Sequence, residues 1–157
     1  MPRHEERRKL PYSADQVFEL VADVEAYPDF LPWCSKLRVT DRRPEGSVDL
    51  LIADMTISFK IHEESFLSKV TLSRERNRID VEYLEGPFKF MNSRWEFKDL
   101  DYGCLVSFSA EFEFRSRFLR ALIGTVFSQA VQRVVRAFED RARAVYGESP
   151  RGCALDS

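Results

Sequence analysis

A change of hydrophobic period at Arg117 divides the sequence into two parts. From Lys36 to Phe114, apolar and polar residues mostly alternate, as in strands that have one face toward solvent. From Arg117 to about Tyr146, apolar residues recur at helical spacing, which predicts one helix about 45 Å long. The apolar face of a sheet must be covered. We therefore expect an α+β fold in which a curved antiparallel sheet of six or seven strands grips a long C-terminal helix.

Turn-forming residues divide the alternating part into separate strands. The clearest alternation comes last, where every second residue from Cys104 to Phe114 is apolar. Ser13 followed by Gln16 has the spacing of a capping box and predicts a helix over about 14–25. The sequence leaves 58–64 unassigned. The predicted strands are 3–10 at an edge, then 36–42, 47–57, 65–74, 78–85, 88–99 and 104–114.

Length and composition exclude several classes of protein. The 157 residues suit one domain, which we place at 1–147, followed by a disordered tail over 148–157. The 24 basic and 26 acidic residues nearly balance, which argues against bulk nucleic-acid binding, and we expect no DNA partner. Three distant cysteines indicate neither a disulfide framework nor a zinc site. Without a signal peptide or a run of roughly 18 apolar residues, the expected location is the cytoplasm, or the periphery of the inner membrane.

Two apolar segments exceed what an ordinary core requires. The segment Tyr27-Pro28-Asp29-Phe30-Leu31-Pro32-Trp33-Cys34 combines two prolines with several large apolar groups, which predicts a compact turn or short helix. Apolar residues also spread over roughly half the circumference of the predicted long helix between 118 and 127, more than the stripe a globular helix needs. A curved sheet and one helix often leave space between them. We expect a pocket there, with its entrance where these two segments meet.

Four stretches of the sequence carry a resemblance to a known family. They are Val24-Glu25-Ala26-Tyr27-Pro28-Asp29-Phe30-Leu31-Pro32-Trp33-Cys34, Glu85-Gly86-Pro87-Phe88, Trp95-Glu96-Phe97, and Val106-Ser107-Phe108 continuing through 112–116 into 137–142. With this order of elements, the chain resembles the START (helix-grip, polyketide-cyclase-like) superfamily. Within it, the chain is similar to the branch of coenzyme Q-binding proteins and a bacterial ribosome-association toxin. The resemblance implies a hydrophobic tunnel for ubiquinone or a related isoprenoid lipid and a chaperone-like role in respiration.

The candidate residues follow from the apolar faces and the over-wide helical arc. Each has a simpler interpretation as ordinary core or, for the arginines, as a solvated surface. The candidates for ligand binding are Phe30, Trp33, Phe66, Tyr83, Trp95, Phe108, Phe112, Phe118, Leu122, Val126 and Phe127. Those for a membrane or partner surface are Leu31, Arg115, Arg117 and Arg120. Among Ser68, Ser93 and Tyr83, spacing cannot select a contact for a polar head group.

Three functions remain open on the sequence. The first is a carrier of ubiquinone or another isoprenoid lipid, the second a ribosome-associating protein that interferes with subunit association, and the third an aromatase/cyclase. His4 and His62 are linked by spacing to no nucleophile or metal set, and Glu63-Glu64 is adjacent rather than opposed. We therefore predict no enzyme activity, no catalytic residues, no metal and no cofactor apart from the bound lipid.

Overall fold

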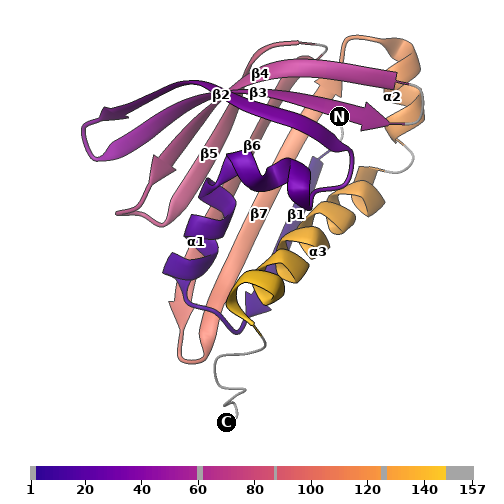
Figure 1. Ribbon diagram of the computed structural model, residues 1–157. Helices are drawn as coiled ribbons and strands as arrows, with labels where there is room; N and C mark the ends of the chain where they lie inside the picture. Colours follow the sequence, from indigo (N-terminus) through magenta and orange to yellow (C-terminus); the bar gives the residue numbers. More distant parts are fainter. Residues whose placement is uncertain (1–2, 60–61, 87, 125–126, 148–157) are drawn as a thin grey trace.

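The computed structural model describes residues 3–59, 62–86, 88–124 and 127–147 (Figure 1). Three short elements open the chain: β1 (Arg3–Leu10), α1 (Ala14–Ala22) and the 3-10 helix η1 (Val24–Asp29). Six strands follow: β2 (Cys34–Glu45), β3 (Val48–Phe59), β4 (His62–Ser73), β5 (Arg78–Glu85), β6 (Phe88–Leu100) and β7 (Gly103–Phe114). The chain then forms α2 (Arg117–Gly124) and α3 (Phe127–Tyr146).

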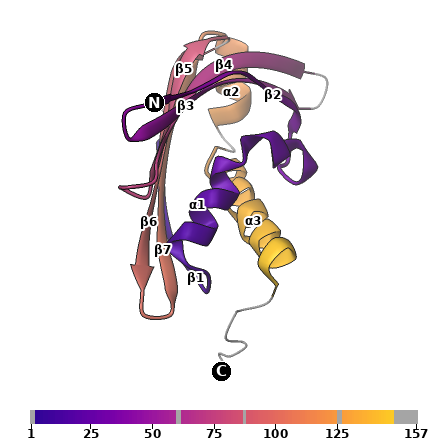
Figure 2. The same ribbon diagram turned by 60° about the vertical axis from the view of Figure 1, so that its left-hand side comes forward.

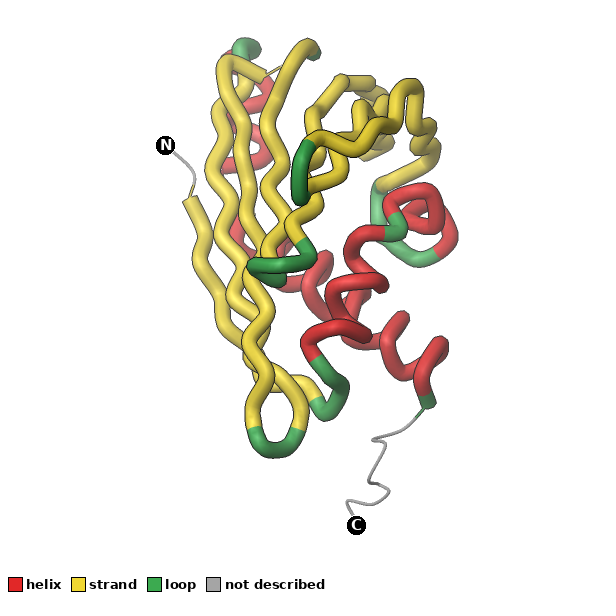
Figure 3. Tube along the Cα trace, turned by 90° about the vertical axis from the view of Figure 1, so that its left-hand side faces the viewer, coloured by secondary structure: helices red, strands yellow, loops and turns green. Residues whose placement is uncertain are grey.

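The strands form one antiparallel seven-stranded sheet in the order β1-β7-β6-β5-β4-β3-β2. Strands β2 to β7 are a meander, and β1 adds to its far edge by pairing with β7. The sheet is curved, and α1 and α3 lie on the same side of it (Figures 2 and 3). We call this side the inner face. The helix-grip fold expected from the sequence is confirmed.

The first helix begins as predicted and ends earlier. The Ser13 hydroxyl accepts from the backbone N–H of Gln16, and the Gln16 side chain accepts from Ser13, which completes the capping box. Instead of continuing to 25, α1 ends at Ala22 and gives way to η1. In an α-helix the ring of Pro28 would clash with the carbonyl of Val24. The tighter helix over 24–29 overlaps only the first three residues of the segment 27–34, for which a compact turn or short helix was predicted.

The single helix predicted over 117–146 is two helices in the structure, which corrects that expectation. Helix α2 ends at Gly124 and α3 begins at Phe127, with 125–126 outside the described residues. Gly124, the last residue of α2, is a poor helix former. The apolar periodicity continues through this point, so it gave no sign of a break. The predicted tail over 148–157 also lies outside the described residues.

The C-terminal half of α3 is fastened to the main core. Phe138 is 5% exposed and packs at 4.9 to 5.3 Å between ring centroids on Trp95, Tyr27 and Phe30. The Tyr146 hydroxyl donates to the Gln16 carbonyl at 2.8 Å, which joins the end of α3 to α1. The position of α3 over the sheet therefore depends on this half of the helix.

We expect Phe138→Ala to lower the free energy of unfolding by about 3–5 kcal/mol, because it leaves a cavity where three rings meet. Val145→Ala on the same helix is the control. Val145 is 51% exposed, so its truncation should stay within about 0.5 kcal/mol of the parent protein. Urea denaturation of both variants measures the difference. Similar losses for the two would mean that Phe138 does not fasten α3.

Candidate ligand-binding site

Burial along the inner face changes from one end of the sheet to the other. At the end covered by α1, Leu51, Ile79 and Cys104 are at most 1% exposed. Farther along the inner face, toward the ends of β3, β5 and β7 and the start of β6, the apolar side chains are only half-buried. They include Met55, Val81, Met91, Phe108, Ala110 and Phe112. The helices thus cover this part of the inner face incompletely.

Cross-strand register joins these half-buried residues into one surface, which we call the inner patch. From β3 to β7 the pairs run across the sheet: Met55 opposite Phe66, Ser68 opposite Tyr83, Val81 opposite Ser93, Ser93 opposite Ala110, and Met91 opposite Phe112. The patch is mainly apolar, with two serines and a tyrosine within it. Gly86 allows the end of β5 to pass close to Phe66, since an added Cβ would lie 2.5 Å from the Phe66 Cβ.

The first half of α3 faces this patch. Val131 and Val135 are 8% and 5% exposed and form a small cluster with Phe108 and Phe112. This cluster is distinct from the main core, which contains Phe138 and the residues of α1. The inner patch is therefore flanked by well-packed residues at both ends. Its apolar side chains stay partly accessible except for Phe66 at its border, and Ser68 within it is buried.

The segment 30–33, between η1 and β2, packs against α3 beside the inner patch. Phe30 packs against Tyr27 and Phe138, and the Arg141 guanidinium lies 5.1 Å from the centre of its ring. The Arg133 guanidinium lies 5.9 Å from the Trp33 ring in the same manner. Two α3 arginines thus hold this aromatic segment by cation–π contacts.

Trp33 has a φ of 67°, in the left-handed region that a bulky residue rarely occupies. Its carbonyl accepts from the backbone N–H of Ser58 at 2.8 Å, which ties the turn to β3. Such a conformation persists only where its surroundings impose it, here the bond to β3 and the contact with Arg133.

The titratable groups beneath this segment are held in their neutral forms. Burial raises the pKa of the Cys34 thiol to about 11 and also raises the pKa of Tyr27, whose hydroxyl donates to the Val21 carbonyl. Neither group carries charge near neutral pH, so this wall of the region stays apolar. Among the described residues, no group of three or more His, Cys, Asp or Glu is placed to hold a metal ion.

The candidates from the sequence fall into three groups. Tyr83, Phe108 and Phe112 lie on the inner patch, and Phe66 borders it at 7% exposure. Trp95, at 6%, is part of the main core, against which Phe30 and Leu31 pack. Phe118 is 59% exposed on α2, which fits a surface contact. The side chains of Leu122, Val126 and Phe127 lie outside the described residues.

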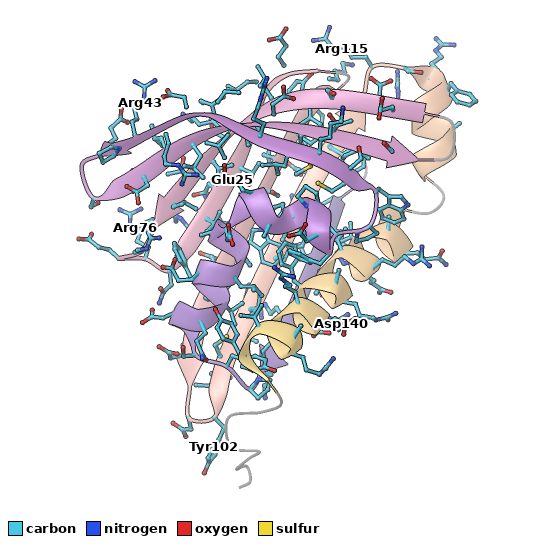
Figure 4. The ribbon with its side chains drawn as sticks, viewed as in Figure 1. Glu25, Arg43, Arg76, Tyr102, Arg115 and Asp140 are labelled. Atoms are coloured by element: carbon cyan, nitrogen blue, oxygen red, sulfur yellow. The ribbon has the colours of Figure 1, made fainter. Side chains whose placement is uncertain are left out.

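The basic candidates are at the surface. Arg115, Arg117 and Arg120 are exposed, and Arg120 pairs with Glu113 at 3.1 Å. Figure 4 shows Arg115 near the start of α2, far from Tyr102 at the opposite end of the sheet. The sequence interpretation missed Arg133 and Arg141, because only the fold reveals that an α3 arginine lies over an aromatic ring.

A separate groove of about 620 Å³ lies between α1, η1 and the β2–β3 hairpin, near Glu25 and Arg43 (Figure 4). Its floor includes Leu51 and Leu72, and its rim is charged. Ion pairs span the rim: Arg42 meets Glu25 at 3.2 Å, and Arg74 meets Glu19 and Asp49 at 2.9 Å each. This groove is distinct from the apolar pocket expected between the sheet and the C-terminal helix.

The sequence of this chain is similar to those of known proteins that include a lipid-transport family. Residues 10–139 match the family described as polyketide cyclase / dehydrase and lipid transport. The ribosome association toxin RatA of Pseudomonas aeruginosa is 34% identical over 139 residues, 88% of this chain and 93% of that protein. The mitochondrial coenzyme Q-binding protein COQ10 homolog B of Xenopus laevis is 26% identical over 92% of this chain and 59% of its own length.

The solution structure of an 18 kDa protein from Caulobacter crescentus superposes with a TM-score of 0.78. Its sequence is 37% identical, and the match covers 94% of this chain and 99% of that one. The match to the family spans most of the chain, from the end of β1 to the middle of α3. The chain therefore belongs to the polyketide cyclase / dehydrase and lipid transport family.

Proposed function

We propose that this protein binds an elongated hydrophobic ligand between the inner patch and α3 and acts as a carrier. The observation that supports this function is the loss of burial along the inner face, where apolar side chains on β3, β5, β6 and β7 stay only half-buried beneath a helix. A folded protein gains free energy by burying such residues. Leaving a continuous set of them partly accessible is typical of a surface that a ligand completes.

Ubiquinone or a related isoprenoid lipid suits this surface. Each CH₂ group removed from water contributes about 0.8 kcal/mol, so part of an isoprenoid tail supplies several kcal/mol of binding. The methionines of the patch, Met55 and Met91, are flexible side chains that adapt to an irregular tail. The name of the Xenopus laevis relative, a coenzyme Q-binding protein, supports the choice of a quinone.

Loading and release would occur at a membrane surface. No helix in the described part of the chain is long and apolar enough to cross a membrane. Helix α2 follows β7 at the end of the sheet that bears the inner patch, and it presents the exposed Phe118 between Arg117 and Arg120. An apolar group flanked by basic ones suits the head-group region of an anionic bilayer. The carrier would act in the cytoplasm and at the periphery of the inner membrane.

We expect protein purified from its host to release a prenylated quinone or a similar lipid into organic solvent, as detected by mass spectrometry. The emptied protein should then take up added ubiquinone, while heat-denatured protein serves as the control. An extract without lipid, together with no uptake of added ubiquinone, would contradict the proposal.

We expect Ala110→Phe to weaken ligand uptake about tenfold, because the new ring occupies part of the inner patch. Ser109→Phe places the same ring on the outer face of the same strand and should leave uptake unchanged. If Ala110 borders unfilled space, its variant should stay within about 1 kcal/mol of the parent in unfolding free energy, whereas overpacking a filled core costs about 1–3 kcal/mol. Equal uptake by the two variants, or a loss of folding by Ala110→Phe, would argue against the site.

Ribosome association is the second candidate. The supporting observation is the RatA relative, which this chain matches over nearly the full length of both proteins. Residues 115–147 contain seven arginines and only two carboxylates, so the α2–α3 side is basic although the whole chain has a net charge of −2. Arginine-rich surfaces bind the phosphates of RNA, and salt weakens that binding.

For this second function we expect salt-sensitive co-sedimentation with ribosomal subunits, reduced about fivefold by the double variant Arg117→Gln/Arg136→Gln. The double variant Arg43→Gln/Arg76→Gln removes two exposed arginines outside α2 and α3 and is the charge-matched control. The same proteins mixed with anionic phosphatidylglycerol vesicles separate the two functions. Sedimentation with vesicles but not with subunits supports the carrier, and the reverse result supports the ribosomal role.

The family description also includes polyketide cyclases. The relatives named above are called a toxin and a coenzyme Q-binding protein, names that denote no reaction. We therefore propose binding without catalysis, so the lipid extracted from the protein should match the lipid supplied to it.

A further inference from the structure

The segment 30–33, which we call the strap, connects the sheet to α3 beside the inner patch. The Trp33 carbonyl accepts from the backbone N–H of Ser58 on β3 at 2.8 Å, and the Arg133 guanidinium of α3 lies 5.9 Å from the centre of the Trp33 ring. Ser58 is three residues from Met55, which belongs to the inner patch. Figures 1 and 2 show η1, which precedes the strap, between β2 and α3. The strap thus joins the two elements between which the ligand is proposed to bind.

The two ends of the strap are held differently. Phe30 packs against the rings of Tyr27 and Phe138 at 5.9 and 5.2 Å between centroids, and these rings are part of the main core or pack against it. Trp33 has a φ of 67°, a conformation that costs free energy for a bulky residue and persists only where its surroundings impose it. The Phe30 end is therefore fixed by ring packing, whereas the Trp33 end depends in part on the attraction of Arg133.

The charge of Arg133 is not neutralised by a carboxylate in the described part of the chain. Helix α3 has two carboxylates, of which Glu139 pairs with Arg8 and Asp140 pairs with Arg143. Arg133 is exposed, and its contact is with a ring. Because a ring supplies no oxygen acceptor, the N–H groups of this guanidinium can still bind an anion.

A phosphate competes with the ring for this guanidinium. The attraction between an exposed arginine and a ring is weak, whereas a guanidinium can form two charge-assisted hydrogen bonds to one phosphate. An anionic bilayer presents many phosphates at once, and aromatic side chains such as those of the strap suit its interface. RNA also carries phosphates, but no hydrocarbon layer lies beneath them. A membrane therefore suits this arginine and its surroundings better than RNA does.

Resting on the proposed function, we propose that Arg133 is a contact for the phosphates of an anionic bilayer and that this contact loosens the strap. Away from the membrane, the guanidinium attracts the Trp33 ring and keeps the strap attached to α3. At the membrane, a phosphate draws the guanidinium from the ring, and the strained Trp33 end of the strap moves. The connection between β3 and α3 is weakened, and the ligand passes into the bilayer. The carrier thus releases its ligand at a membrane rather than into water.

The test measures the rate at which protein loaded with a short-chain ubiquinone delivers it to vesicles, which are then separated from the protein by centrifugation. We expect the parent to deliver about tenfold faster to phosphatidylglycerol vesicles than to neutral phosphatidylcholine vesicles. In Arg133→Gln, delivery to neutral vesicles should rise about threefold, because the strap is held less firmly. The preference of this variant for anionic vesicles should fall to about twofold, because the phosphate contact is lost.

Arg143→Gln is the matched control. Arg143 is exposed on the same helix and has the same charge, but it pairs with Asp140 rather than with a ring. Its variant should deliver to neutral vesicles at the rate of the parent, because it removes a charge without changing the contacts of the strap. The same rates in Arg133→Gln and Arg143→Gln would therefore contradict the role of Arg133.

The remaining outcomes separate this inference from the function on which it rests. Equal delivery by the parent to both kinds of vesicle would overturn the inference, as would sedimentation of the parent with ribosomal subunits but not with anionic vesicles. A parent that binds no ubiquinone would overturn the carrier function and this inference with it. Circular dichroism checks folding. If Arg133→Gln is unfolded, Trp33→Leu decides the result: without the ring, delivery to neutral vesicles should rise about threefold, and an unchanged rate would overturn the inference.

Discussion

The structure depends on the mismatch between a wide curved sheet and the few helices available to cover it. A sheet of seven strands presents an apolar inner face that must be kept from water. Helix α1 and the aromatic group around Phe138 cover one end completely. Among the described side chains, the first half of α3 covers the other end with the buried Val131 and Val135, and the inner patch there is half-buried.

The asymmetry of α3 has a consequence for ligand entry. Its C-terminal half is held by ring contacts at Phe138, by the Tyr146 hydroxyl, and by the ion pair of Glu139 with Arg8. Its first half, as far as its side chains are described, rests on a small apolar cluster around Val131 and Val135. Local opening requires least free energy where few buried contacts are lost. A ligand would therefore enter at the α2 end, without disturbing the contacts that fix the fold.

Much of the fold could be predicted from local pattern, whereas the site depends on long-range register. Alternation and turn residues located the strands from β2 to β7 because both signals act over a few residues. The pairing of β1 with β7 joins opposite parts of the chain, so no local pattern places His4 beside Ala110. From the sequence, residues 3–10 are predicted only as a charged edge strand, and the residues near His4 in space cannot be identified. The sequence predicted one helix where the structure has α2 and α3, because apolar residues recur at helical spacing through Gly124 and this spacing does not depend on helix propensity.

On β1, His4 Nε2 lies 2.8 Å from Glu6 Oε1, and a histidine beside a carboxylate has the groups that general acid–base catalysis requires. A carrier and a cyclase differ in which atom of the ligand lies within hydrogen-bond distance of such a pair. Cyclisation needs the base within hydrogen-bond reach of the proton it removes, whereas recognition needs only an oxygen of the head group at that place. Here the pair lies at the edge strand, and the surface beside it is an apolar sheet that suits an unreactive tail. Under the proposed carrier function, the polar pair at one border and the apolar surface across the remaining strands would meet the two parts of an amphiphile.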